Sequence, residues 1–344
     1  MKIAMFTDIH WGAKGNSAVH NSDCMDFIRW FTDRAKEEKA DAIVFLGDWF
    51  ENRNAINVGT LNASYEGFEY IVKAFPSLPI YMIIGNHDLY HRSNRKSFST
   101  NHFKTFENVI LVNELTKFPE INGIICPFLF RDEYPVLAAN ISKLKPKYVF
   151  GHFEFKNFVV TGSDRRIEHG PDHTQFTGPT YIFSGHFHKR QVTDNIVYIG
   201  NAFPSNYGDV FDKERGMCVL DTDTDDVYFI DWEDAPLYFK YKLSVLLDSN
   251  VVFPPKSTVK CIVDIEISYS EAQAIKEQMI KDFNLKDFRL EEDIATRTSI
   301  VEGETIDIGE MTNIDDAVIK MLAENIPASA NIHPATLIEI YEKL

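Results

Sequence analysis

The chain has 344 residues, 44% of them hydrophobic, which is enough for one large domain and a smaller one around a sizeable core. Its formal net charge of −16 at first sight argues against a nucleic-acid partner, but residues 291–344 alone carry −9 of that charge, so the acidity excludes little. The cysteines lack the paired spacing of a disulfide framework, so we expect buried, reduced thiols at Cys24, Cys126, Cys218 and Cys261.

The sequence shows no sign of a membrane segment. No apolar run reaches the roughly 18 residues that a membrane span needs. Met1-Lys2-Ile3-Ala4 enters a predicted strand directly, without the apolar stretch typical of a signal peptide. We therefore expect a cytoplasmic protein that has no membrane association.

Apolar runs typical of buried strands alternate with helical patterns from residue 1 to about 235. Helical spacing of apolar side chains predicts helices over 26–39 and 61–75. This alternation predicts an α/β sandwich with sheets in the middle and helices outside. The predicted strands are 3–7, 42–46, 80–84, 109–112, 123–126, 148–150, 181–183, 196–199, 217–220 and 226–230.

The pattern changes after residue 235. Val259, Cys261 and Val263 alternate with polar residues, which indicates a half-buried strand that continues to residue 267. A helical pattern follows from residue 270 to 283. We expect residues 236–290 to form a small α/β unit of their own.

The last part of the chain divides into a linker and a helical pair. Residues 291–310 are acidic and show little periodicity, whereas 311–344 predicts two short amphipathic helices. So small a pair can hardly bury its own apolar faces. It either packs back on the parent domain or docks on a partner protein.

Polar side chains that can bind metals follow the carboxyl ends of five predicted strands. Each motif alone is more often structural than catalytic. Ligands at the ends of several strands, however, converge in the crevice where α/β folds place their active sites. We therefore predict one shared metal site from Asp8, His10, Asp48, Asn86, His152, His186 and His188.

This set is too large for a single cation. Imidazole and carboxylate ligands without thiolate suit manganese, iron or zinc better than magnesium or calcium. Two cations would need a bridging ligand, and Asp48 is the natural bridge because a carboxylate has two oxygens. His87, next to a predicted ligand, is placed to protonate a leaving oxygen as general acid.

The order of these motifs resembles the calcineurin-like metallophosphoesterase superfamily. The matching stretches are Asp8-x-His10, Gly47-Asp48, Gly85-Asn86-His87-Asp88, Gly151-His152 and Gly185-His186-x-His188. More narrowly, the pattern resembles the DNA-repair nuclease branch, with its SbcD-type exonuclease and phage recombination endonuclease subunits. Those subunits work with an SMC-like coiled-coil ATPase.

The resemblance implies a ligand set and catalytic residues. One metal position would be formed by Asp8, His10, Asp48 and His188, and the other by Asp48, Asn86, His152 and His186. The nuclease branch typically uses manganese, so two manganese ions are expected, with magnesium as the alternative. His87 would be the catalytic histidine, and Asp88 would orient His87 or a ligand.

The resemblance also implies an organisation for the whole chain. A metallophosphoesterase β-sandwich flanked by helices would span residues 1–235, and a small α/β capping domain that positions DNA would span 236–290. Beyond the acidic linker 291–310, the C-terminal helical pair 311–344 would dock on the ATPase. Many relatives form homodimers, and the helix over 61–75 is the candidate contact.

The sequence after Gly47-Asp48 departs from parts of the superfamily. It lacks the Asp-Arg-Gly of the protein phosphatases, which counts against a phosphoprotein substrate. Glu51 stands where some nuclease relatives have a histidine, so its role is open.

Basic residues lie close to the predicted site along the chain. They either contact DNA phosphates at the mouth of the crevice or form ordinary solvated surface. The predicted DNA contacts are Arg53, Arg92, Arg95, Lys96, Arg165, Arg166, Lys189 and Arg190.

The leading interpretation is a two-metal DNA nuclease, with exonuclease and endonuclease activity, in double-strand-break repair or recombination. A stand-alone phosphodiesterase or phosphatase for small nucleotides would use the same ligands but would not need the terminal helical pair. A binding scaffold with a vestigial site is disfavoured by the complete ligand set.

Overall fold

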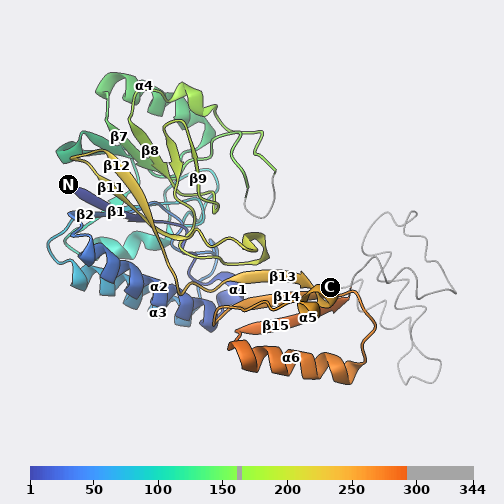
Figure 1. Ribbon diagram of the computed structural model, residues 1–344. Helices are drawn as coiled ribbons and strands as arrows, with labels where there is room; N and C mark the ends of the chain where they lie inside the picture. Colours follow the sequence, from blue (N-terminus) through green and yellow to red (C-terminus); the bar gives the residue numbers. More distant parts are fainter. Residues whose placement is uncertain (161–164, 293–344) are drawn as a thin grey trace, which may run out of the picture. The chain divides into compact units, whose positions relative to one another are not determined.

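The computed structural model describes residues 1–160 and 165–292 (Figure 1). The predicted linker from residue 293 onward and the predicted helical pair 311–344 lie outside the described residues. The described part is a mixed α/β structure with two large sheets, as the sequence predicts.

The first sheet has six strands in the order β12-β11-β1-β2-β3-β4. Neighbours from β1 to β4 are parallel, while β11 pairs antiparallel with both β1 and β12. Its strands are β1 (Lys2–Phe6), β2 (Ala42–Phe45), β3 (Ile80–Ile83), β4 (Val109–Val112), β11 (Gly216–Asp221) and β12 (Asp226–Asp231).

The second sheet also has six strands, in the order β5-β6-β7-β8-β10-β9. Its middle strands run parallel, and an antiparallel strand closes each edge. Its strands are β5 (Thr116–Phe118), β6 (Gly123–Ile125), β7 (Tyr148–Gly151), β8 (Tyr181–Ser184), β9 (Gln191–Thr193) and β10 (Ile196–Tyr198).

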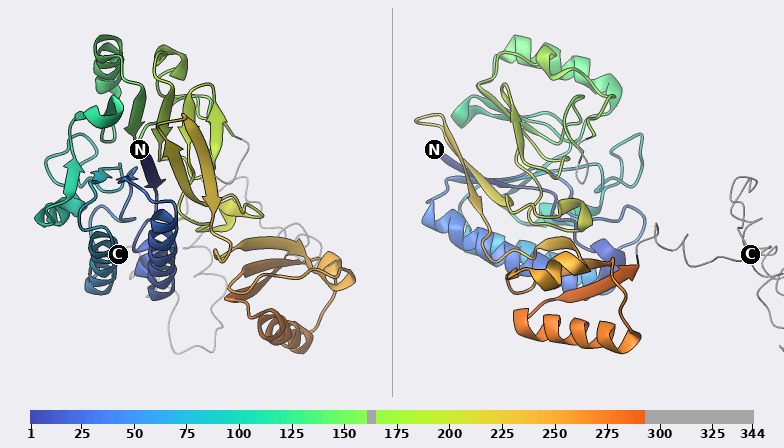
Figure 2. Two further views of the ribbon diagram at one scale, coloured as in Figure 1. Left: turned by 60° about the vertical axis from the view of Figure 1, so that its left-hand side comes forward. Right: turned by 45° about the vertical axis from the view of Figure 1, so that its right-hand side comes forward.

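The two sheets pack face to face because both faces of their central strands are apolar. In β1, Ile3 and Met5 point into the core between the sheets, with Phe150 and Phe183 of the second sheet. Ala4 and Phe6 point to the other side, under the helices α2 (Ala18–Glu37) and α3 (Val58–Ala74), which lie side by side (Figure 2). Helix α4 (Tyr134–Leu144) covers the outer face of the second sheet.

The helices differ from the prediction mainly at their starts. Helix α2 begins eight residues before the predicted residue 26, because Ser17 caps it by accepting a hydrogen bond from the His20 N–H. Its first turns bury polar side chains such as Asn21 and Asp23, which periodicity of apolar residues cannot detect. The unpredicted α4 is short and buries only Tyr134, Leu137 and Ile141.

Shorter helices connect these elements. They are α1 (Ala13–Asn16), η1 (Ser99–Thr105), η2 (Pro119–Ile121), η3 (Arg131–Glu133), η4 (His173–Gln175) and η5 (Tyr207–Asp209).

A third, three-stranded sheet has its own core. It contains β13 (Tyr238–Lys242), β14 (Thr258–Val263) and β15 (Asp287–Glu292), with α5 (Leu243–Asp248) and α6 (Tyr269–Phe283). Buried Phe239, Val259 and Phe288 form the centre of this core. Strand β14 ends at Val263, four residues before the predicted end.

Two observations concern the thiols and the membrane. All four cysteines are buried and free, which confirms the expectation for them. Among residues 1–160 and 165–292, no helix is long and apolar enough to cross a bilayer.

Candidate metal centre

The seven predicted metal ligands meet where five strands end. Asp8 and His10 follow β1, Asp48 follows β2 and Asn86 follows β3, all in the first sheet. His152 follows β7, and His186 and His188 follow β8, in the second sheet. Because the two sheets face each other, residues more than 140 positions apart in the chain meet at this site.

The loops after β1 and β2 are fastened to each other through the main chain. The Asp8 N–H donates to the Gly47 carbonyl at 3.0 Å, and the Trp11 N–H donates to the Trp49 carbonyl at 2.8 Å. Asp8, His10 and Asp48 adopt the left-handed conformation, with φ of 50°, 51° and 61°. Such strain is unfavourable for these residues and gathers at functional sites, where the surroundings hold it in place.

Two glycines allow the ligand loops to approach closely. A Cβ at Gly85 would lie 2.2 Å from Asp48 Oδ1, and one at Gly185 would lie 2.8 Å from Asp8 Oδ2. Any larger residue at either position would push a predicted ligand out of the site.

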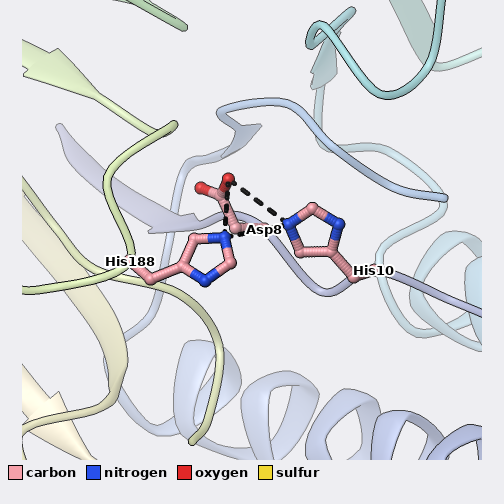
Figure 3. Close-up of side chains that lie close together, drawn as sticks. All are labelled: Asp8, His10 and His188. Carbon is pink, nitrogen blue, oxygen red and sulfur yellow. Dashed lines mark hydrogen bonds and ion pairs between the residues drawn. The ribbon is translucent and has the colours of Figure 1, made fainter. Parts of the chain in front are cut away.

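The first metal position is the predicted set Asp8, His10, Asp48 and His188. His10 Nε2 and His188 Nε2 lie 3.1 Å apart. Asp8 Oδ1 lies 3.7 Å from the former and 3.9 Å from the latter (Figure 3). These three side chains can hold one ion.

The second metal position is the predicted set Asp48, Asn86, His152 and His186. Asn86 Oδ1 lies 3.0 Å from His152 Nε2 and 2.9 Å from His186 Nδ1. Asp48 Oδ2 lies 3.3 Å from His152 Nε2 and 3.9 Å from His10 Nε2. Asp48 thus touches both positions, as a bridging ligand must.

The hydrogen-bond partners of His152 and His186 indicate that this site requires positive charge. His152 Nδ1 bonds to the Leu46 carbonyl at 2.8 Å and His186 Nε2 to Glu154 Oε2 at 3.1 Å. Their other ring nitrogens face only acceptors, Asn86 Oδ1 and Asp48 Oδ2, so either extra protons or cations must lie between them. Burial lowers the pKa of His152, but Asp48 and Asp8 outweigh it and raise that pKa to about 9.

The carboxylate of Asp48 stays ionised, and the imidazole of His188 stays neutral. Burial opposes ionisation of Asp48, yet His152, His87 and His10 hold its pKa well below the usual range. Burial and the neighbouring His10 lower the pKa of His188 to about 4, so its imidazole is neutral and free to bind a metal. Carboxylate, amide and imidazole groups of this kind are the ligands expected for a pair of transition-metal ions.

His87 lies beside the first metal position. Its main-chain N–H donates to Asp48 Oδ1 at 2.7 Å, and its Nδ1 bonds to the Glu51 carbonyl at 2.7 Å. Its ring packs edge-to-face against His10, with centroids 5.0 Å apart. These contacts leave Nε2 as the nitrogen that can give a proton to a substrate.

Asp88 braces the main chain and does not contact the His87 ring. Its Oδ2 accepts N–H bonds from Asp48 and Gly85, and its Oδ1 accepts them from Trp49 and Phe50. Burial and the Asp48 carboxylate raise the pKa of Asp88 to about 7 against the effect of these bonds. Asp88 therefore ties the loop after β2 to the loop after β3.

The predicted DNA-contacting residues divide into three groups. Arg95 pairs with Glu133 and donates to the Phe128 carbonyl, and Arg190 pairs with Asp231 over the Phe229 ring, so both are committed to internal partners. Arg166 donates to the Asn157 carbonyl, and the Arg165 carbonyl accepts from the Val160 N–H. Arg92, Lys96 and Lys189 are exposed, and Arg53 is partly buried.

Arg53 and Arg92 stand out among these residues. Neither guanidinium has a hydrogen bond or ion pair with any residue in 1–160 or 165–292. Burial and the charge of Arg92 lower the pKa of Arg53. Asp48 and Asp88 raise this pKa by less. Two cationic groups near each other, with no ion pair to a described residue, are suited to binding an anion.

The structure adds contacts of residues whose role the sequence interpretation left open or missed. The Glu51 side chain lies against His10, and Glu154 bonds His186. The Phe128 ring packs near both His152 and His186, with ring centroids 6.2 and 6.1 Å away. The sequence had drawn attention to Glu51, just after Gly47-Asp48, but no pattern in it singled out Glu154 or Phe128.

The fold and the site define a metal-dependent phosphoesterase. The family model of the calcineurin-like phosphoesterases matches residues 1–190, and the chain belongs to this family.

Two known proteins resemble the chain more specifically. Exonuclease subunit 1 of Enterobacteria phage T4 is 25% identical over 236 residues, which cover 67% of each chain. A dimetal phosphatase from Danio rerio matches 64% of this chain and 91% of its own, at 11% identity and a TM-score of 0.40. A likeness that low carries no argument about function.

Proposed function

We propose that the chain is the nuclease subunit of a DNA repair or recombination complex and hydrolyses phosphodiester bonds with two manganese ions. The observation that carries this proposal is Asp48, whose carboxylate touches two adjoining sets of metal ligands. The choice of DNA is supported by the similarity to an exonuclease subunit.

The residues of the site have separate tasks in this proposal. The first metal position would hold one ion and the second position the other, sharing Asp48. When bound, the ions supply charge that neutralises the phosphate and activates water. His87 is held by Asp48 and the Glu51 carbonyl, so its Nε2 protonates the leaving oxygen.

The surroundings favour a nucleic-acid strand as the substrate. Arg53 and Arg92 would bind phosphates beside the scissile one, because neither guanidinium forms an ion pair with a described residue. Exposed Lys96 and Lys189 remain proposed phosphate contacts. Arg95 and Arg190 are left out because their guanidinium groups are already bound.

The first test is cleavage of end-labelled single- and double-stranded DNA by the purified chain with manganese. We expect metal-dependent cleavage, and a His87→Ala variant should lose about 100- to 10,000-fold while still binding two ions. His173→Ala is the matched control, because His173 lies on η4 and bonds the Asp194 carboxylate. His87-dependent cleavage of small nucleotides, with none of DNA even beside the ATPase, would favour the stand-alone enzyme.

The proposed partner is an SMC-like coiled-coil ATPase that binds residues 311–344. A chain that ends at residue 310 should keep hydrolysis of a small phosphodiester and lose stimulation by the ATPase. Retained stimulation would contradict this docking segment.

We also propose that two copies associate through α3. Leu61, Asn62, Tyr65, Glu66 and His102 line an open hollow there, and the side chains of Leu61 and Tyr65 are about two-fifths exposed. Exposed apolar side chains at a hollow are typical of association surfaces. Leu61→Asp should shift the mass in light scattering from dimer to monomer, whereas Val136→Asp on α4 should not.

A further inference from the structure

The histidines at the two metal positions have carboxylate neighbours that lie outside the ligand set. His10 Nδ1 lies 2.8 Å from Glu51 Oε2 at the first position. His186 Nε2 lies 3.1 Å from Glu154 Oε2 at the second. In both cases the carboxylate is on the side of the ring away from the convergent ligand atoms.

The backbone of Glu51 is fixed, while its side chain retains freedom. The Glu51 N–H donates to the Trp11 carbonyl at 3.0 Å, beside the bridge between Trp11 and Phe50. Its carboxylate is 40% exposed, and the contact with His10 Nδ1 is short without meeting hydrogen-bond geometry. The buried Nδ1 has no other acceptor among the described residues, so a small rotation of Glu51 would complete the bond.

Glu154 is held in a similar way at the second position. Its N–H donates to the Tyr134 hydroxyl at 2.9 Å. Its second oxygen, Oε1, lies 2.8 Å from Nε2 of the exposed His169.

We propose that Glu51 and Glu154 are positioning residues, each of which orients one metal-binding histidine and so sets the affinity of one of the two metal positions. This inference rests on the proposed two-metal function. A carboxylate that accepts the outer N–H of a histidine fixes its tautomer and makes the inner nitrogen a better ligand. Glu51 would act on the first position and Glu154 on the second.

Glu51 has a separate link to the general acid through its main chain. The His87 Nδ1 bonds to the Glu51 carbonyl, which remains when the side chain is replaced. Substitution of Glu51 should therefore weaken metal binding without removing the support of His87. The Glu51 carboxylate also lies 3.9 Å from His87 Nδ1, so metal binding, measured apart from activity, separates the proposed role from a direct role in catalysis.

The test measures manganese binding to the full-length, metal-stripped protein by calorimetry. Glu51→Ala should weaken one of the two binding events about 10- to 100-fold, and Glu154→Ala the other. The double variant should weaken both. Glu51→Gln should restore most of the affinity because an amide oxygen still accepts the Nδ1 proton, and Glu107→Ala, at an exposed site, is the control.

Electron paramagnetic resonance and kinetics complete the test. When the manganese added is just enough to fill both positions of the wild-type protein, the Glu51→Ala variant should lack the resonance signal of two coupled manganese ions. At saturating manganese its kcat should return to within roughly threefold of the wild-type value.

Different outcomes would overturn the inference and the proposed function. Wild-type affinity at both positions in the two alanine variants would overturn the inference alone, as would a kcat that stays low with both ions bound. A wild-type protein that binds no ion pair or cleaves no phosphodiester would overturn the proposed function itself.

Discussion

The two sheets build their halves of the site in different ways. The first sheet supplies the oxygen ligands Asp8, Asp48 and Asn86 on loops fastened by main-chain hydrogen bonds, which Asp88 ties together. The second sheet supplies His152 and His186, and a single acceptor holds each ring from behind.

This difference distinguishes side chains that hold the ligand loops in place from side chains that set the affinity for metal. On the first-sheet side, substitution of Asp88 should disturb the loops themselves, because four backbone N–H groups donate to its carboxylate. Substitutions on the second-sheet side should change metal and proton binding while the loops remain in place.

The largest effect is expected where the halves meet. Asp48→Ala removes the shared ligand, so both manganese-binding events should weaken by more than the about 100-fold that loss of an outer partner costs. Calorimetry on the metal-stripped protein measures this, with exposed Asp33→Ala as the control. Normal uptake of either ion would refute the bridging role of Asp48.

The scaffold side is tested at Asp88. Four N–H groups now donate hydrogen bonds to the Asp88 carboxylate. Asp88→Asn places an amide NH₂, itself a donor, against two of them. The free energy of unfolding should fall by about 3–5 kcal/mol, as it does when a buried charge network is broken. Urea unfolding measures it, and a loss below about 1 kcal/mol would show that Asp88 does not brace these loops.

The imidazole side is tested by pH. The pKa of His152 in the metal-free protein is raised to about 9, so its protonation stabilises the fold below about pH 6.5 and is lost as pH rises through about 9. Metal-free protein should lose about 3 kcal/mol of stability between these pH values. With manganese bound the loss should disappear, because an ion replaces the proton; equal loss in both states would contradict this.

The smallest effect is expected outside both halves of the site, at Arg53 and Arg92, which form no ion pair with a described residue. Arg53→Ala and Arg92→Ala should each cost about 1–2 kcal/mol in DNA binding and lower the slope of log K against log salt by about 1. Fluorescence anisotropy at several salt concentrations measures both. Arg29→Ala on α2, where Arg29 pairs with Asp26, should leave the slope unchanged.

Much of the fold and most of the candidate site could be predicted from the sequence because both depend on local patterns. The strand of 109–112 was predicted to the residue, and the ligands closely follow apolar strands, with a glycine directly before Asp48, Asn86, His152 and His186. The predicted helix was shorter than α2 because the first turns of α2 bury polar groups. Arg95 and Arg190 could not be recognised as internally paired, since Glu133 and Asp231 are 38 and 41 residues away.

The sequence by itself determined which groups are available for chemistry: carboxylates, an amide and imidazoles at strand ends, with His87 beside them. Only the tertiary structure decided how they are held. His152 is oriented by the Leu46 carbonyl 106 residues away, and His186 approaches Asn86 across 100 residues. Such contacts arise from the packing of two sheets, and no periodicity along one chain segment can encode them.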